Sequence, residues 1–277
     1  MPNQETVYNV ADRVATITLN RPDKLNAWTA TMEQEVRAAM HEAEHDQNVR
    51  VIILSGAGRG FCAGADISLL GAIAQEGLGD RGHENFLRNT SNGGRQNVRP
   101  DFQKKYSYFP SIEKPVIAAV NGPAVGLGFI ISLYCDLRFA SDSARFGTAF
   151  AKRGLIAEYG LAWLLPRLIG PANALDMLFS ARLFDANEAL RIGLVNQVFP
   201  QSSFMDSVNA YAKDLACSMS PRSMRVIKDQ VYNAMFQTLS EAFETSEKEM
   251  VQSLQCEDFK EGVAHFLEKR AAAFTGK

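Results

Sequence analysis

The sequence predicts a mixed α/β protein, with a strand-containing core over residues 1–200 and a helical region over residues 201–277. Two apolar runs of strand length each lead through a glycine-rich turn into an apolar helix start, around residues 49–70 and 115–135. From residue 203 to the end, apolar residues recur only at helical spacing. The 277 residues, 46% of them hydrophobic, are enough to build a large core.

Composition excludes several classes of protein. The formal net charge is −2 and basic residues alternate with acidic ones, so we expect no nucleic-acid and no membrane partner. The four cysteines lack CxxC spacing, which indicates reduced thiols and a cytoplasmic protein. The polar, acidic N-terminus does not have the character of a signal or transit peptide. His41 and His45 lie one helical turn apart without an evident third ligand, so we expect no metal site.

The chain begins with a hairpin, predicted from strand-like runs at 7–10 and 14–19. A helix is expected from about Thr31, where Thr31 and Gln34 have capping-box spacing. Its buried face is predicted from apolar residues at helical intervals: Met32, Val36, Met40 and Ala43. The first strand–turn–helix unit follows, with a strand at 49–54, a glycine-rich turn at 55–66 and a helix start at 67–70.

Residues 71–113 are polar, glycine-rich and irregular, and we expect them to form a mobile lid or to be partly disordered. Aromatic residues at the end of this segment predict an aromatic helix that packs in the core or over an apolar ligand: Phe102, Tyr106, Tyr108 and Phe109.

The second unit has a strand at 115–120, a turn at 121–130 and a buried helix at 131–135. Residues 115–135 carry no charge and are long enough to span a membrane, but the Asn-Gly-Pro at 121–123 and two further glycines interrupt the run. A buried strand–turn–helix is therefore expected. Its turn either packs tightly or presents N–H groups at a helix N-terminus to an anion or a developing oxyanion.

The remaining elements are expected in a simple order along the chain. A strand at 136–140 and a short run at 144–147 precede a loop and short helix at 148–160 that contain Glu158. Helices at 161–169 and 172–179 are separated by Gly170 and Pro171, and a capping box opens at Asp185 before a helix that Gly193 ends. The last strand is expected at 194–199, and amphipathic helices follow, one of them after Ser220.

A nucleotide-binding interpretation has little support. Residues 58–63 fit the loose GxGxxG/A pattern after a strand, which is a weak signal when it stands alone. A dinucleotide fold also needs a second strand ending in an acid about 20 residues further on, and the acids there, Glu76 and Asp80, lie in the irregular segment. No GK[ST] sequence exists, which excludes a P-loop.

Several motifs resemble those of the crotonase (enoyl-CoA hydratase/isomerase) superfamily. They occur in that family's order and cover nearly the whole chain, with the weakest fit over 71–105: residues 19–22, 59–67, 114–124, 135–140, 185–195 and 268–270. The resemblance implies repeated ββα turns that form two nearly perpendicular sheets, followed by helices that make a homotrimer or a dimer of trimers. It also implies an acyl-CoA thioester partner in fatty acid metabolism, with coenzyme A as part of the substrate and no separate cofactor.

The resemblance assigns an oxyanion hole to the two glycine-rich turns. Its donors, aligned on the motifs, are the backbone N–H groups of Ala65 and Leu127, which hold the thioester carbonyl as it becomes an enolate. Leu127 replaces the usual glycine. A backbone donor needs no particular side chain, but leucine requires a backbone conformation open to it and a side chain that points away from the thioester.

The catalytic carboxylates depart from the family's most familiar pattern. Ile130 and Phe150 stand where typical hydratases, which are lyases, carry two glutamates, so that mechanism is in doubt. Glu158 matches the single acid of double-bond isomerases in the family. We expect Leu155, Ile156 and Leu161 to desolvate it and raise its pKa. A solvated loop glutamate, a hydrolase- or dehalogenase-like enzyme and a silent acyl-CoA-binding protein are the alternatives.

The resemblance also implies a set of substrate contacts. These are Lys24 and Leu25, Ala63, Asp66 and Ile67 for the nucleotide and pantetheine, Gly126, Ile130 and Phe150 as further substrate contacts, and Phe266 and Lys269 from a neighbouring subunit. Lys269 beside a phosphate is physically sensible, and a solvated helix lysine is its alternative.

Overall fold

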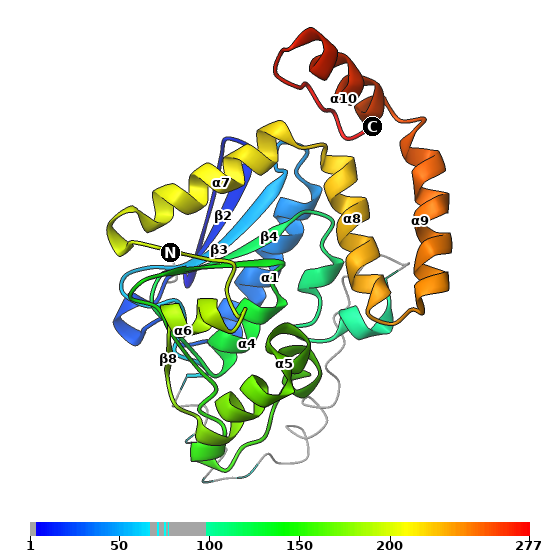
Figure 1. The fold of residues 1–277 in the computed structure, drawn as a ribbon. Helices are drawn as coiled ribbons and strands as arrows, with labels where there is room; N and C mark the ends of the chain where they lie inside the picture. The colour runs from blue at the N-terminus through cyan, green and yellow to red at the C-terminus, as the bar shows by residue number, and fades with distance from the viewer. Residues whose placement is uncertain (1–3, 67–70, 72–74, 76, 78–97) are drawn as a thin grey trace.

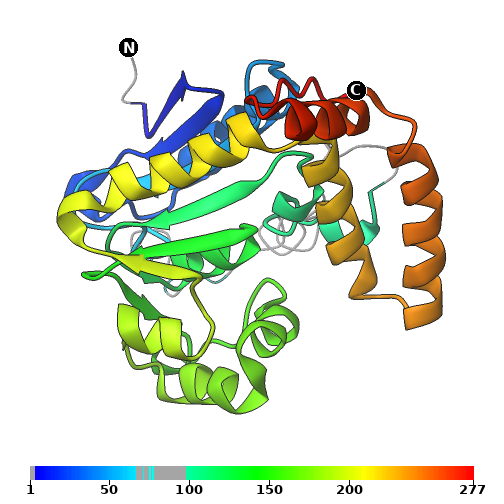
Figure 2. The same ribbon diagram turned by 45° about the horizontal axis from the view of Figure 1, so that its top comes forward.

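The computed structural model describes residues 4–66, 71, 75, 77 and 98–277. The predicted helix start at 67–70 and most of the predicted lid lie outside these residues. In Figure 1 a twisted sheet lies between α1 (Ala30–His45) on one face and α7 (Phe204–Ser218) on the other. Figures 1 and 2 both show α9 (Leu239–Ser253) standing off from this core. α10 (Glu257–Glu268) follows it, and the tail after α10 returns to the core, where the Arg50 guanidinium donates to the Phe274 carbonyl.

The large sheet has six strands in the order β1-β2-β3-β4-β6-β9. β1 and β2 form the predicted antiparallel hairpin, and every later pairing is parallel. The described strands follow chain order without reversal, so this sheet lacks the topological switch point at which a doubly wound fold binds a dinucleotide. The strand bounds are Thr6–Ala11, Val14–Leu19, Val51–Gly56, Val116–Val120, Leu137–Ser141 and Gln197–Phe199.

The second sheet shows the predicted ββα repeat. β4 and β6 lie in the large sheet, while the strand after each, β5 (Pro123–Val125) or β7 (Arg145–Gly147), lies in the small sheet and leads to a helix. β8 (Phe184–Asp185) completes the small sheet, and isolated bridges extend its pairing from Trp28 to Ala65 and from Cys62 to Ala124. The prediction of one long turn at 121–130 was wrong, because it contains β5 and because α4 (Leu127–Tyr134) begins before residue 131.

Both faces of the large sheet are buried, as expected for parallel strands that read as continuous apolar runs. On β3, Val51 and Ile53 pack with Phe204 and Val208 of α7, while Ile52 and Leu54 join the main core on the other face. The strand period of two therefore divides one apolar run between two layers. The main core also takes the predicted buried face of α1: Met32, Val36, Met40 and Ala43.

Two local predictions were wrong for identifiable reasons. α1 is capped by Thr29, whose side chain accepts a hydrogen bond from the Met32 amide, so the Thr31–Gln34 capping box does not form. The aromatic helix at 102–109 is absent: the backbone is extended at Lys104 (φ −85°, ψ 172°), and two short 3₁₀ turns replace the helix, Pro100–Gln103 and Phe109–Ser111. Phe102, Tyr106 and Phe109 are nevertheless buried.

The remaining helices largely follow the sequence prediction. α5 (Leu161–Ser180) is interrupted at Gly170, whose φ of 77° and ψ of 157° are not helical. α6 (Ala186–Arg191) is capped by Asp185, which accepts from the Glu188 amide, and α8 (Pro221–Ala234) is capped by Ser220. Across the described ranges, no helix combines the length and apolar character needed to cross a bilayer.

Candidate active site

Two glycine-rich turns lie directly against each other at the centre of the molecule. The amides of Phe61 and Cys62 donate to the Pro123 carbonyl at 3.1 and 3.0 Å, and the Val125 amide donates to the Cys62 carbonyl at 2.9 Å. Glycine makes this approach possible, since a Cβ on Gly128 would lie 2.2 Å from the Cys62 oxygen. The predicted convergence of the two turns therefore rests on direct backbone contact.

The backbone N–H groups of Ala65 and Leu127 have no acceptor among the described residues. Ala65 pairs with Trp28 through its neighbours: the Trp28 amide donates to the Gly64 carbonyl at 2.8 Å and the Asp66 amide donates to the Trp28 carbonyl at 3.0 Å. The Ala65 N–H therefore points away from Trp28. Leu127 is the first residue of α4, where an N–H lacks an intrahelical partner.

Leu127 adopts an ordinary backbone conformation, and the residue before it takes the unusual one. Gly126 has φ of 55° and ψ of −117°, which only glycine adopts readily, while Leu127 is not among the residues with positive φ. The Leu127 side chain is buried in the main core. A Cβ on Gly64 would lie 3.7 Å from the Leu127 nitrogen, so the chain next to Ala65 passes close to this amide.

Two buried asparagines, which the sequence did not single out, hold the first turn in shape. The Asn121 side chain donates to the Gly56 and Gly58 carbonyls at 2.9 and 3.0 Å and accepts from the Gly56 amide. The Asn26 side chain donates to the Gly60 carbonyl at 2.8 Å. An asparagine close to glycine-rich turns is a signal that the sequence contains, because a buried side-chain amide has to form hydrogen bonds with the backbone groups near it.

Asp66 and its neighbours also form contacts that hold the first glycine-rich turn in place. The Asp66 carboxylate pairs with the Arg21 guanidinium at 2.9 Å. Leu25 has a left-handed conformation with φ of 48°, and its carbonyl accepts from the Ala63 amide at 2.9 Å. Lys24 is exposed beside them, so the predicted group of Lys24, Leu25, Ala63 and Asp66 shares one edge of the turn. Ile67 lies outside the described residues.

Glu158 lies half-buried in the loop before α5, and burial raises the pKa of its carboxyl group. The direction is the predicted one, but the predicted neighbourhood is wrong in part: Leu155 is 39% exposed and Ile156 is 77% exposed, whereas Leu161 is buried. The Glu158 carboxylate makes no hydrogen bond or ion pair with any other residue that the structure describes. It is therefore not held in a structural contact.

Aromatic contacts tie the Glu158 loop to both turns. Tyr159 meets Tyr106 edge to face with ring centroids 4.7 Å apart, and Tyr106 meets Trp28, the partner of Ala65, at 6.3 Å. The Tyr134 hydroxyl at the end of α4 donates to the Tyr159 carbonyl at 2.6 Å. Segments near residues 28, 65, 127 and 158 are thus joined through four ring side chains.

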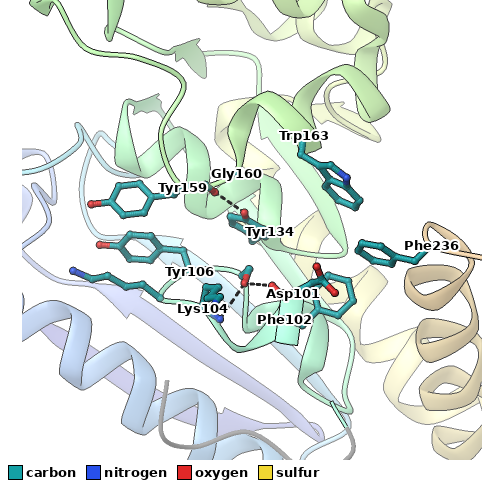
Figure 3. A pocket seen from close by; sticks show the side chains of 11 residues that line it. Asp101, Phe102, Lys104, Tyr106, Tyr134, Tyr159, Gly160, Trp163 and Phe236 are labelled. Atoms are coloured by element: carbon teal, nitrogen blue, oxygen red, sulfur yellow. Dashed lines mark hydrogen bonds between the residues drawn. The ribbon is translucent and has the colours of Figure 1, made fainter. Parts of the chain in front are cut away.

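A cavity of about 390 Å³ opens next to this loop (Figure 3). Tyr159 and Gly160, which directly follow Glu158, form part of its wall. Six aromatic side chains line the cavity: Phe102, Tyr106, Tyr134, Tyr159, Trp163 and Phe236. The sequence predicted Phe102 and Tyr106 as a possible cover for an apolar ligand, and it missed the other four.

The other predicted site residues are spread more widely. Ile130 and Phe150 are 1% and 6% exposed and belong to the main apolar core. Phe266 and Lys269 lie exposed on α10 and at its end. Among the described residues, His, Cys, Asp and Glu side chains form no group of three that could hold a metal ion.

Comparison with known proteins gives a consistent result over the full length of the chain. A sequence model of the family described as enoyl-CoA hydratase/isomerase matches residues 9–277. A probable enoyl-CoA hydratase of Rhodobacter capsulatus is 36% identical over 98% of this chain and 97% of its own. The 1,2-epoxyphenylacetyl-CoA isomerase of Escherichia coli is 32% identical over 97% of each chain. The crystal structure of an enoyl-CoA hydratase from Bacillus anthracis superposes with a TM-score of 0.87 at 29% identity, covering 99% of this chain and 100% of its own.

Proposed function

The chain belongs to the enoyl-CoA hydratase/isomerase family, and on that premise we propose that it shifts a double bond in an enoyl-CoA thioester with Glu158 as acid and base. The observation that carries the proposal is the Glu158 carboxyl group, half-buried, without a structural partner and with a raised pKa. A raised pKa makes the protonated form of this group more available, which suits a group that must both accept and return a proton.

In this mechanism, the Ala65 and Leu127 N–H groups bind the thioester oxygen. Both lack another acceptor among the described residues, and that of Leu127 lies at the positive end of the α4 dipole. As the thioester becomes an enolate, negative charge develops on the oxygen, and fixed donors stabilise it without reorganising. One such donor typically contributes about 10²–10³ in rate.

One carboxylate is sufficient for isomerisation. Glu158 removes a proton from C2 or C4, the electrons pass into a dienolate held by the two N–H groups, and Glu158 returns the proton at the other carbon. Hydration in the manner of typical family members needs two acids, and at the corresponding positions this chain has Ile130 and Phe150, which are buried and carry no titratable group. The chemistry therefore favours isomerisation.

The remaining features of the proposal follow the family resemblance. Coenzyme A is part of the substrate, and Lys24, Leu25 and the segment from Ala63 to Ile67 bind its nucleotide and pantetheine. Gly126, Ile130 and Phe150 make further contacts with the substrate. The protein acts as a cytoplasmic homotrimer or dimer of trimers in fatty acid metabolism, in which Phe266 and Lys269 reach a neighbouring subunit's nucleotide.

Substitution of Glu158 tests the proposal. We expect Glu158→Gln to lower kcat for interconversion of 3-enoyl-CoA and 2-enoyl-CoA by at least about 10²-fold, the usual contribution of a general acid–base. Binding of the CoA ester should be unchanged, because glutamine keeps the shape of the side chain. In the wild type, kcat/KM should fall as the pH drops through the raised Glu158 pKa, because only the carboxylate accepts a proton.

The control is Glu247→Gln on α9, which removes an exposed carboxylate far along the chain and should retain full activity. Activity of wild-type size in Glu158→Gln would contradict the assignment. Tight binding without turnover of any enoyl-CoA by the wild type would instead support a silent acyl-CoA-binding protein, an alternative that the apolar Ile130 and Phe150 favour.

A further inference from the structure

The aromatic cavity beside Glu158 has no role in the mechanism so far, and we propose that it binds an aromatic ring at the end of the acyl group. The substrate class is then aryl-substituted acyl-CoA thioesters, in preference to straight-chain ones. The inference rests on the proposed function, because it takes the cavity to be the acyl end of the thioester site.

The position of the cavity fits an acyl terminus. Tyr159 and Gly160 of its wall directly follow Glu158, so the cavity opens beside the loop that carries the proposed acid and base. Tyr134, another wall residue, ends the eight-residue helix that Leu127 begins. At 1.5 Å per residue, about 10 Å of helix axis separates them, which leaves room for a short linker between the thioester carbonyl and a ring.

Two of the wall tyrosines have hydroxyl groups that already donate hydrogen bonds to the protein, so their rings are what they offer to a ligand in the cavity. The Tyr106 hydroxyl donates to the Glu33 carboxylate at 3.3 Å, and the Tyr134 hydroxyl donates to the Tyr159 carbonyl at 2.6 Å. Tyr106 and Tyr159 stand edge to face at an interplanar angle of 83°. Such an arrangement offers ring edges and faces, which attract another aromatic ring.

The opposite wall is a stack of two rings, each covered by an arginine. Trp163 of α5 stacks on Phe236, just after α8, with centroids 5.2 Å apart and planes 14° from parallel (Figure 3). The Arg167 guanidinium lies 4.0 Å from the Trp163 centroid, and that of Arg99 lies 4.1 Å from the Phe236 centroid. Cation–π and stacking contacts therefore fix this wall before a ligand arrives.

Volume and ring contacts together favour an aryl group. A cavity of about 150 Å³ is enough to hold benzene, so a cavity of about 390 Å³ holds a ring with its linker. A straight chain of equal carbon number buries apolar area as well, but it loses more rotamer freedom and makes no ring–ring contact. An aromatic pair adds an attraction that corresponds to about a two- to tenfold gain in affinity.

Equilibrium binding by calorimetry tests the inference without requiring turnover. Phenylacetyl-CoA is compared with octanoyl-CoA, and 4-phenylbutanoyl-CoA with decanoyl-CoA, so that each pair has equal carbon number. We expect at least one aryl ester to bind about two- to tenfold more tightly than its straight-chain partner. Trp163→Leu should bring this ratio close to one while changing the affinity for the straight-chain ester less than twofold.

The matched control is Phe179→Leu, which removes an aromatic ring from the same helix at a position that is 75% exposed. It should leave the ratio unchanged. If circular dichroism shows that Trp163→Leu is unfolded, Phe236→Leu removes the other ring of the stack and carries the same expectation. A wild-type ratio of one or below for both pairs, or a ratio that neither ring substitution alters, overturns the inference and leaves the proposed isomerase intact. Failure of all four esters to bind overturns the proposed acyl-CoA site itself.

Discussion

At the residue scale, comparing two helical glycines shows that the contact between the turns requires a residue without a Cβ at position 128. A Cβ on Gly128 would lie 2.2 Å from the Cys62 carbonyl oxygen, far inside van der Waals contact. A Cβ on Gly262 of α10 would meet only the edge of Phe274, at 3.8 Å. Both sites are helical, so the difference between them lies in packing and not in backbone propensity.

We therefore expect opposite effects from the same substitution. Gly128→Ala should lower the free energy of unfolding by about 1–3 kcal/mol, because overpacking forces the backbone apart. Gly262→Ala should raise it by up to about 1 kcal/mol, because alanine favours a helix over glycine. Urea unfolding with a fitted m-value measures both. Equal stability of the two variants would contradict the close approach of the turns.

The raised pKa of Glu158 implies that its ionised carboxylate lowers the stability of the folded protein. A carboxyl group whose pKa is higher in the folded than in the unfolded state destabilises the protein as pH rises through that interval, and the full penalty applies above the folded-state pKa. Below the unfolded-state pKa the penalty is absent. Glu158→Gln should accordingly be no less stable than the wild type at neutral pH, so its lost turnover cannot be attributed to unfolding.

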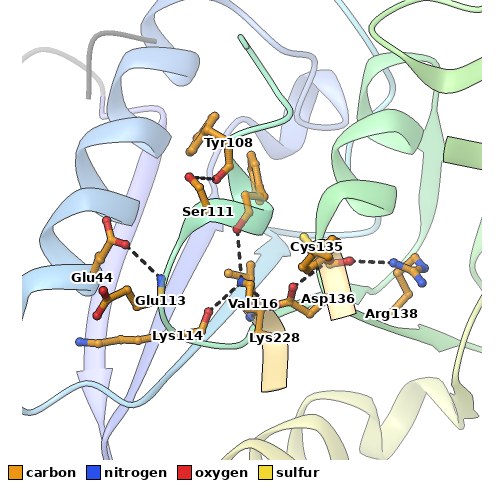
Figure 4. A network of polar contacts seen from close by, with 12 residues as sticks. Glu44, Tyr108, Ser111, Glu113, Lys114, Val116, Cys135, Asp136, Arg138 and Lys228 are labelled. Atoms are coloured by element: carbon orange, nitrogen blue, oxygen red, sulfur yellow. Dashed lines mark hydrogen bonds and ion pairs between the residues drawn. The ribbon is translucent and has the colours of Figure 1, made fainter. Parts of the chain in front are cut away.

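At the element scale, one buried cation fixes α8 against the core (Figure 4). The Lys228 ammonium is 2.7 Å from the Asp136 carboxylate and donates to the Lys114 carbonyl at 3.1 Å. Asp136 in turn accepts from the Val116 amide and the Tyr232 hydroxyl. The starts of β4 and β6 are thereby joined to α8, the helix that leads to Phe236 of the aromatic cavity.

Removing this cation should be costly. Lys228→Met leaves the Asp136 carboxylate buried without its ion-pair partner, which typically lowers the free energy of unfolding by about 3–5 kcal/mol. Lys213→Met is the control, because Lys213 pairs with Asp12 on the surface, and its unfolding midpoint should hardly change. Thermal or urea unfolding compares the two. A small effect at Lys228 would show that α8 is held by apolar packing instead.

Sequence patterns predicted elements where one period governed a long run, and failed where short segments depend on tertiary contacts. The hairpin, the α1 face and the break at Gly170 follow from periodicity and glycine chemistry. β5 was missed because three residues between glycines carry no periodic signal. The aromatic helix was wrong because aromatic spacing alone does not show where the backbone is extended, as it is at Lys104.

The candidate site divides in the same way. The positions of Ala65, Leu127 and Glu158 came from motifs, and the structure gives each a backbone or carboxyl group without another partner among the described residues. The cavity could not be predicted as a whole, because packing alone brings together Tyr134 of α4, Trp163 of α5 and Phe236 after α8. Their separation along the chain exceeds any local period.

At the scale of the whole molecule, the C-terminal region carries apolar side chains that the rest of this chain leaves uncovered. No residue of α9 is buried, and Leu239 and Phe243 on it are 84% and 62% exposed. Phe266 and Leu267 on α10 are 77% and 73% exposed. Large apolar surfaces of this kind mark protein–protein interfaces, and they support the proposed association of several copies of the chain.

Charge introduced into this surface should separate the copies. We expect the wild type to sediment as a trimer or a larger multiple of three, and Phe243→Glu to shift the distribution towards monomer at micromolar concentration, because a carboxylate at an apolar interface must be desolvated. Glu244→Gln, the adjacent residue on α9, is the control and should leave the mass unchanged. Sedimentation equilibrium gives the masses directly. A monomeric wild type would contradict the proposed trimer. It would also contradict the proposed role of Phe266 and Lys269, because these exposed residues at the end of the chain could then reach no nucleotide bound to a neighbouring subunit.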